Sequence, residues 1–337
     1  MSEGELNMSC NPKKLAVLLL LLGLLTMLSC SDDDCPTCPD TNLVLTGQWE
    51  VVDGHTAHQF NFNEDKTVDV LYEANYGFRS YESHVYFVTE SQVLLSYTAY
   101  NVSMSGDTLR LIHVSDTITL ARNDTGPTLD DWLAPVVPST VYNAPIDRAV
   151  DIAWHVDRLW YANAYTSDFL YKFNLWLGMA DDSLYTTQSA WGICWADDDL
   201  WVSSNGSDNI YRIDTLTGSS LHTSPDMGAW LDGIAYDGQY LWTGSNNSRT
   251  IYRYDPVADI VTDSFYIDLQ IHGMTYYDGY LYACTNGVIN RIQMSPFEVV
   301  AAYRVEGAHI EGISHDGTGF WLAYEDNDGA HVAQVSL

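Results

Sequence analysis

The C-terminal two-thirds of the chain repeat one pattern of apolar and polar positions five times. Each copy has a short apolar segment, a polar turn and a second apolar segment that opens with a leucine or phenylalanine and a large aromatic residue. These aromatic residues are Trp160, Trp201, Trp242, Tyr282 and Trp321, spaced 41, 41, 40 and 39 residues apart. A period of about forty residues built from short strands is typical of a β-propeller with one four-stranded blade per repeat.

The first apolar segment of each repeat predicts the innermost strand of a blade. The five segments align at 151–154, 192–195, 233–236, 273–276 and 312–315. Glycine opens all of them except the first, which opens with Asp151. The fifth repeat has no fourth strand before Leu337, and a candidate outer strand at 139–143 precedes the first repeat. We expect that stretch to complete the last blade, so that a five-bladed propeller over 139–337 closes without an open edge.

A basic side chain recurs in the third strand of four repeats. These residues are Lys172, Arg212, Arg253 and Arg291. Their fixed position indicates a structural role, and we expect them to pair with aspartates of neighbouring blades.

Residues 43–124 show eight short stretches with the alternation of β-strands. They are 48–52, 59–63, 67–72, 84–89, 92–97, 102–104, 108–112 and 117–121. Gly47-Gln-Trp49 and the closing segments 106–112 and 118–122 resemble the lipocalin-like domains of envelope lipoproteins. The resemblance implies a small antiparallel barrel, and strands this short favour an interior filled by side chains over one holding an apolar ligand. Residues 125–138, with three prolines, are the expected linker, and the fold class is all-β.

The N-terminal residues 1–29 have the pattern of a secretory signal peptide. Lys13-Lys14 precede an apolar run from Leu15 to Leu25, which is too short to be a good membrane span. Met8 is an alternative start to Met1. Ser29-Cys30 resembles a bacterial lipobox, which implies cleavage before Cys30 and acylation of its thiol. The alternative is an ordinary cleaved signal that leaves Cys30 as a spare thiol.

Residues 30–42 form the expected tether. Its acidic run, 31–34, resembles signals that export lipoproteins to the cell surface in Bacteroidota-like diderms, although a solvated linker explains it equally well. We therefore expect a bacterial cell-envelope protein, anchored by lipid on the surface or periplasmic face of the outer membrane. No other membrane contact is expected. Cys35 and Cys38 are expected to form a local disulfide, and Cys194 and Cys284 to be buried free thiols.

The formal net charge of the chain is −31, and the mature chain keeps all of it. Such a surface repels the phosphates of nucleic acids and anionic lipid headgroups. Nucleic-acid binding is therefore excluded.

Candidate site residues come from two positions just before the aligned glycine. Directly before it stand Val150, Trp191, Asp232, His272 and Glu311. Two residues earlier stand Arg148, Ser189, Trp230, Gln270 and His309. The residue between the two positions is apolar in every repeat, so strand alternation directs it between blades and the flanking positions toward the channel mouth. Chemical variety at fixed positions of a repetitive scaffold is typical of a binding site.

Three interpretations of these positions remain open. Asp232, His272 and Glu311 offer ligands for a divalent cation such as Ca²⁺. Trp191 and Trp230 offer stacking walls of an acidic pocket for a sugar or a cationic amine. The third interpretation is a solvated rim whose polar groups bond to backbone.

The segments 233–242 and 251–256 resemble the propellers of the glutaminyl cyclase, gluconolactonase and NHL-like group. Bacterial glutaminyl cyclases share the five-blade count, but their Phe-Thr-Gln-Gly-Leu and Asn-Glu-Leu-Glu segments are missing from this sequence, so their active site does not transfer. The gluconolactonase-type metal site, with acidic and asparagine ligands, is only loosely matched by Asp232 and Glu311, with a histidine in place of asparagine.

From these features we expect a lipid-anchored protein whose propeller binds a small ligand or an envelope protein at the channel mouth, without catalysis. The expected site contains Trp191, Trp230, Asp232, His272, His309 and Glu311. The alternative is a propeller enzyme, resembling a glutaminyl cyclotransferase or a metal-dependent lactonase or lyase, that uses Asp232, His272 and Glu311.

Overall fold

The structure is a computed structural model that describes residues 45–53, 57–88, 92–96, 98–114, 116–144, 148, 150–163, 168–204, 206–227 and 230–337. The expected signal peptide, Cys30 and the tether lie outside these residues. Among the residues described, no helix is long and apolar enough to span a membrane.

Eight antiparallel strands form a closed barrel in chain order, and the first strand pairs with the last. They are β1 (Gly47–Val51), β2 (Ala57–Phe62), β3 (Thr67–Glu73), β4 (Arg79–Val88), β5 (Gln92–Leu95), β6 (Thr98–Ser105), β7 (Thr108–His113) and β8 (Asp116–Arg122). Trp49, Phe62 and Leu120 are fully buried, and the indole N–H of Trp49 donates to the Leu45 carbonyl at 2.8 Å. Each of the eight strands overlaps one of the eight expected stretches.

The fourth strand differs from the expectation, because it begins at Arg79 rather than at 84. A 3₁₀ turn, η1 (Asn75–Gly77), precedes it. The added residues pair with β3 and also bond to the propeller: Tyr81 N–H donates to Asn286 O at 3.0 Å, and Arg79 N–H donates to Asn290 Oδ1 at 2.8 Å. These polar residues form a strand because both β3 and the propeller bond to their backbone. The local alternation of apolar and polar residues gives no sign of these partners.

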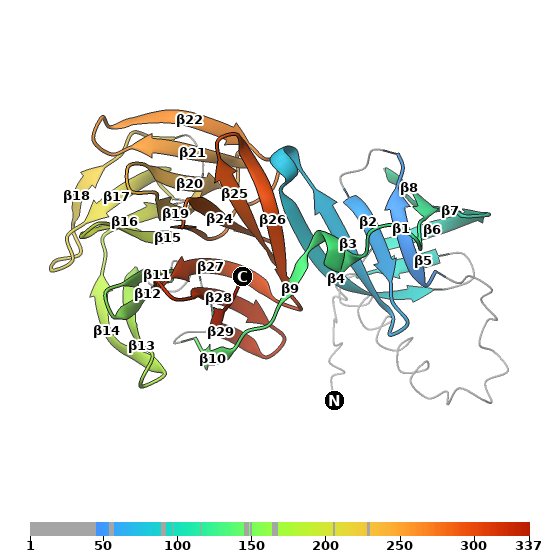
Figure 1. Cartoon of the computed structure of the whole chain (residues 1–337), viewed down its shortest axis with the longest axis horizontal. Helices are drawn as coiled ribbons and strands as arrows, with labels where there is room; N and C mark the ends of the chain where they lie inside the picture. The colour runs from blue at the N-terminus through green and yellow to red at the C-terminus, as the bar shows by residue number, and fades with distance from the viewer. Residues whose placement is uncertain are drawn as a thin grey trace, which may run out of the picture. The chain divides into compact units, whose positions relative to one another are not determined.

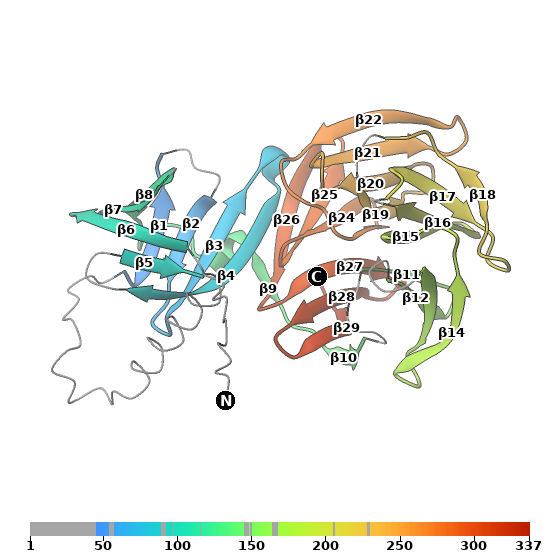
Figure 2. The same ribbon diagram turned by 180° about the vertical axis from the view of Figure 1, so that it is seen from behind.

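The propeller has five blades, coloured from green to red in Figures 1 and 2. The first contains β11 (Asp151–His155), β12 (Arg158–Asn163), β13 (Phe169–Asn174) and β14 (Met179–Tyr185). The second contains β15 (Gly192–Ala196), β16 (Asp199–Ser204), β17 (Asn209–Ile213) and β18 (Ser220–Thr223). The third contains β19 (Leu231–Tyr236), β20 (Leu241–Ser245), β21 (Thr250–Asp255) and β22 (Ile260–Tyr266). The fourth contains β23 (Met274–Tyr277), β24 (Tyr280–Thr285), β25 (Val288–Met294) and β26 (Phe297–Val305).

The last blade closes the ring as expected. It contains β27 (His309–His315), β28 (Phe320–Asp326), β29 (Gly329–Val335) and, as its outer strand, β10 (Thr140–Asn143). The strand β10 pairs antiparallel with β29 from Thr140 opposite Gln334 to Asn143 opposite His331. The segment expected as linker, 125–138, contains a short helix, α2 (Leu129–Trp132), and a strand, β9 (Ala134–Val136), that adds parallel to β26.

The innermost strands approach one another too closely for side chains at the aligned glycine. A Cβ on Gly233 would lie 2.5 Å from the carbonyl oxygen of His272, and one on Gly273 would lie 2.6 Å from the Cα of Gly312. Such contacts exclude any larger residue, which explains why the repeat marks this position with glycine.

Asp151 takes the glycine position in the first blade. Its side chain is fully buried and accepts the backbone N–H of Ile152 at 2.9 Å and of Ile193, in the next blade, at 3.0 Å. The backbone N–H of Ile313, in the last blade, also bonds to it. Burial raises the pKa of this carboxyl well above its usual value, against the effect of the backbone donors. One side chain thus joins the innermost strands of three blades.

The basic residues of the third strand differ from the expectation, because they pair inside their own blade. Lys172 binds Asp182 at 2.7 Å, and Arg212 binds Asp199 at 3.2 Å. Each also lies directly opposite the aromatic landmark of the second strand, as Lys172 does opposite Trp160, with its Nζ 4.9 Å from the ring centroid. The short reach from β13 to its neighbours β12 and β14 explains the choice of partner. The expected burial of the free thiols Cys194 and Cys284 is confirmed.

Replacing Asp151 by Ala should lower the free energy of unfolding by at least about 2 kcal/mol, because buried backbone N–H groups of three blades lose their acceptor. Urea unfolding of the variant measures this change. Asp157→Ala, which removes an exposed carboxylate from the adjoining turn, is the matched control and should change stability by less than about 0.5 kcal/mol. Equal stability of the two variants would contradict the bridging role of Asp151.

Candidate functional site

The two candidate positions have different surroundings. At the position next to the glycine, Asp232 and Glu311 are only 5 % and 6 % exposed. At the outer position, Trp230 is 56 % exposed. The apolar residues between them, among them Leu231 and Ile310, are fully buried. Burial therefore separates a polar floor inside the channel from a rim that solvent reaches.

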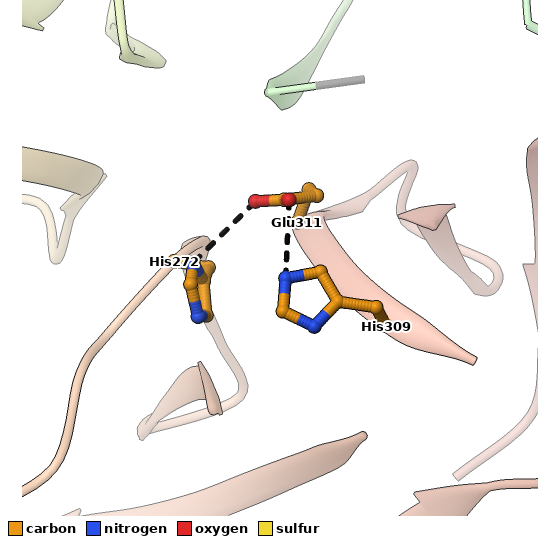
Figure 3. Close-up of side chains that lie close together, drawn as sticks. All are labelled: His272, His309 and Glu311. Atoms are coloured by element: carbon orange, nitrogen blue, oxygen red, sulfur yellow. Dashed lines mark ion pairs between the residues drawn. The ribbon is translucent and has the colours of Figure 1, made fainter. Parts of the chain in front are cut away.

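Three of the candidate side chains meet at one point (Figure 3). Glu311 Oε1 lies 3.1 Å from His309 Nε2, and Glu311 Oε2 lies 3.4 Å from His272 Nδ1. The two imidazole rings are 4.9 Å apart between centroids and lie edge to face. The site thus has one carboxylate held between two histidines from adjacent blades.

Local structure fixes these side chains. His309 and Glu311 are two positions apart in β27, on either side of the buried Ile310. His272 precedes β23, next to the buried Ile271, and its backbone N–H donates to Cys284 O at 3.0 Å. The backbone at all three residues is therefore held by the packing of the blades.

The histidines determine the charge of Glu311. Burial alone would raise the pKa of this carboxyl, but hydrogen bonds from His272 and His309, together with their charge, lower it to about 2. The same hydrogen bond raises the pKa of His309 above its usual value, although burial opposes the rise. Glu311 is therefore a carboxylate whose charge is largely compensated within the cluster.

Asp232 has the opposite character. Burial raises its pKa well above the usual range, and the negative charge of Glu311 raises it further. A hydrogen bond from Asn246 Nδ2 to Asp232 Oδ2, 2.5 Å long, opposes this rise. The two candidate carboxyl groups thus differ: the environment of Asp232 favours the protonated form, and that of Glu311 favours the ionised form.

Asn246 also connects Asp232 to the rim. Its backbone N–H donates to Trp230 O at 3.1 Å, so the exposed indole of Trp230 and the buried Asp232 share one neighbour. Trp191, the other candidate aromatic residue, is partly buried just before β15, and its backbone N–H donates to Ser203 O. Of the two tryptophans, Trp230 presents the open face.

Four residues near the cluster were not part of the expected site, although one of them, Arg148, stands at a candidate position. Glu325 lies opposite His309 in the β27–β28 pair, and Arg148 Nε lies 3.6 Å from its carboxylate. Tyr161 is fully buried, and the charges of Glu325 and Glu311 add to the effect of burial in raising its pKa. Asn246 is the fourth. Glu325 could have been identified from the register of β27 with β28. Tyr161 and Asn246 could not, because the repeat shows no unusual residue at their positions.

A cavity of about 590 Å³ lies elsewhere, against the β11–β12 turn of the first blade. Its lining includes two ion pairs, Arg158 with Asp181 and Lys172 with Asp182. These side chains satisfy one another, and no buried polar group converges on the space in the residues described. Volume alone therefore does not favour this cavity over the cluster at His272, His309 and Glu311.

No family model matches the chain, and no curated protein matches it. Among solved structures, the glutaminyl cyclase of Myxococcus xanthus is similar, with a TM-score of 0.52 and 11 % sequence identity over 60 % of this chain and 95 % of that chain. A streptogramin B lyase structure has a TM-score of 0.38 and 14 % identity over 88 % of this chain and 96 % of that chain. The hydrazine synthase of Kuenenia stuttgartiensis has a TM-score of 0.40 and 13 % identity over 55 % of this chain and 57 % of that chain. The first similarity shows the shared propeller fold.

In an NMR titration, His309 should have a pKa above the usual 6.5, and Glu311→Gln should lower it. Glu325→Gln is the graded control and should lower it less, because the charge of Glu325 is a smaller cause of the shift. Since the folded-state pKa of His309 is raised, its ion pair stabilises the fold fully below pH 6.5, as long as Glu311 is ionised, and loses its effect as the pH rises through the raised value. An unchanged titration midpoint of His309 in both variants would contradict its pairing with Glu311.

Proposed function

We propose that the propeller binds a small hydroxylated ligand, such as a sugar, at the channel mouth. The observation that carries this proposal is the connection from the exposed indole of Trp230 through Asn246 to the buried Asp232. An aromatic face beside fixed carboxyl and amide groups suits a ligand with one apolar face and a hydroxylated edge.

The charge balance favours a neutral hydroxylated ligand over a cationic amine. Glu311 is ionised, but two histidines already surround it, and the environment of Asp232 favours the protonated form. Little uncompensated negative charge remains for an ion pair with the ammonium group of such a ligand. The same groups offer hydrogen-bond donors and acceptors in fixed positions, which is what hydroxyl groups require.

A propeller enzyme is the second candidate, and the opposite pKa shifts of Asp232 and Glu311 favour it. Two carboxyl groups whose environments push their pKa values apart are a common arrangement for general acid and base catalysis. In this function Asp232 would donate a proton to a leaving group, and Glu311 would hold positive charge or accept a proton. The substrate would be the hydroxylated ligand itself or its glycoside or ester.

We also propose that the mature chain is anchored in the bacterial outer membrane through an acylated Cys30, with the barrel as a spacer or second binding unit. The support is the apolar run that ends at Ser29-Cys30 and the acidic tether that follows. An envelope protein, rather than a small molecule, is the partner if no soluble ligand binds.

Trp230→Ala should weaken sugar binding about fivefold, because stacking on an exposed tryptophan contributes on the order of 1 kcal/mol. Oligosaccharides that raise the melting temperature would be selected first, and their affinity measured by calorimetry. Trp176→Ala is the matched control, since Trp176 is 93 % exposed at the β13–β14 turn. Equal losses in the two variants, or no sugar bound by the wild type, would contradict the proposal.

Catalysis makes a different prediction. Asp232→Asn and Glu311→Gln should each lower turnover of a chromogenic glycoside or ester about 100-fold or more while the melting curve keeps its shape. A binding protein shows no turnover in the wild type.

Replacing Cys30 by Ala should move the protein from the membrane fraction to the soluble envelope fraction. Fractionation of cells that express either form measures this change. A membrane-bound Cys30→Ala protein would contradict lipid anchoring at this residue.

A further inference from the structure

We propose that His272, His309 and Glu311 form a binding site for a divalent transition-metal ion of the Zn²⁺ type. This inference rests on the proposed function for the position of the ligand at the channel mouth. It deepens that function by naming a metal ion as the group that would hold the ligand. It differs from the expected metal set, because His309 takes the place of Asp232, which bonds to Asn246 instead.

The geometry of the cluster suits a single ion. One ligand atom from each residue can be chosen so that all three lie within 4.8 Å of one another. The carboxylate oxygens are 3.1 and 3.4 Å from the imidazole nitrogens. Ligands at about 2.0–2.2 Å from a tetrahedral ion lie roughly 3.3–3.6 Å from each other. Small side-chain rotations would therefore bring the three atoms onto one ion.

The donor set selects the metal. Two imidazole nitrogens and one carboxylate suit Zn²⁺ and its transition-metal neighbours, whereas Ca²⁺ takes six to eight oxygen ligands. The cluster supplies too few oxygens for Ca²⁺. The charge also fits, because a divalent ion would replace the positive charge that the histidines now supply to Glu311.

Two of the three proposed ligands are shielded from solvent. The side chains of Glu311 and His272 are 8 % and 13 % exposed, and His309 is the most open at 41 %. An ion can enter from the His309 side and would meet two ligands that are already shielded from water. Three protein ligands leave a fourth position open, as in zinc sites that bind a further ligand.

Tyr161 is a second observation that points to a bound ligand. Its hydroxyl is buried and, among the residues described, accepts and donates no hydrogen bond, while Glu311 and Glu325 lie close enough to raise its pKa. A buried hydroxyl without a partner is costly and needs an explanation, and a bound molecule at the adjacent cluster supplies one. A neutral phenol can donate its proton to an oxygen atom held on the ion. Tyr161 would thus act as a positioning donor for the metal-bound ligand.

Calorimetry with Zn²⁺ alone tests the site, using chelator-treated full-length protein without a histidine tag. We expect one ion per chain with micromolar affinity or better, no competition from millimolar Ca²⁺, and a loss of at least about tenfold in His272→Ala, His309→Ala and Glu311→Gln. The matched control is His84→Ala, which removes another histidine paired with a glutamate at 3.0 Å, in the barrel. Circular dichroism confirms that each variant is folded.

Two outcomes would overturn the metal site: no Zn²⁺ bound by the folded wild type, or equal affinity in the three variants and in His84→Ala. The readout is separate from the proposed function, because calorimetry with Zn²⁺ alone needs no sugar and sugar binding is measured in its own titration. Sugar binding without Zn²⁺ binding would overturn the metal site alone, whereas Zn²⁺ binding without sugar binding would overturn only the sugar.

The role of Tyr161 has its own readout. In protein loaded with Co²⁺, azide binding changes the visible spectrum of the ion and reports on the open position. Tyr161→Phe should keep the affinity for Co²⁺ and weaken azide binding about tenfold, as loss of one hydrogen bond predicts. Equal azide affinity in the two proteins would overturn the role of Tyr161.

Discussion

The close approach of the innermost strands at the propeller axis is the constraint on which the rest of the structure depends. The backbones lie so near that a single Cβ on Gly233 or Gly273 would collide with the next strand. The carboxylate of Asp151 occupies the remaining glycine position and bonds to three strands. The five blades are therefore held at a fixed distance, and the residues just before each glycine are brought close together.

This crowding also explains why carboxyl groups are concentrated in the channel. Asp151, Asp232 and Glu311 are all buried there, and each is stabilised in a different way. Backbone N–H groups bond to Asp151, an amide bonds to Asp232, and two imidazoles bond to Glu311. Buried charges need partners, so only Glu311, which has cationic partners, is strongly ionised. The chemistry of the candidate site follows from this division.

The repeat in the sequence predicted the five blades and the closing strand, and the alternation within residues 43–124 predicted eight barrel strands, because periodic patterns record local structure directly. It also placed His272, His309 and Glu311 in two neighbouring positions of the blades. It did not group His309 with Glu311 as partners of His272, since that contact depends on how two blades meet. Tyr161 and Asn246 were missed for the same reason: each reaches the channel from a strand or loop where the repeat shows no unusual residue.

The pairing of β10 with β29 means that the ring can close only after its last blade is made. The backbone of Ser139 bonds to Gln334, 195 positions further along the chain. During synthesis, β10 emerges before the other strands of the ring and has no partner until the last blade follows. Contacts so distant along the chain form slowly, and an unpaired strand edge attracts other chains in the meantime. A chain with this topology is therefore most vulnerable to aggregation between the emergence of its first blade and that of its last.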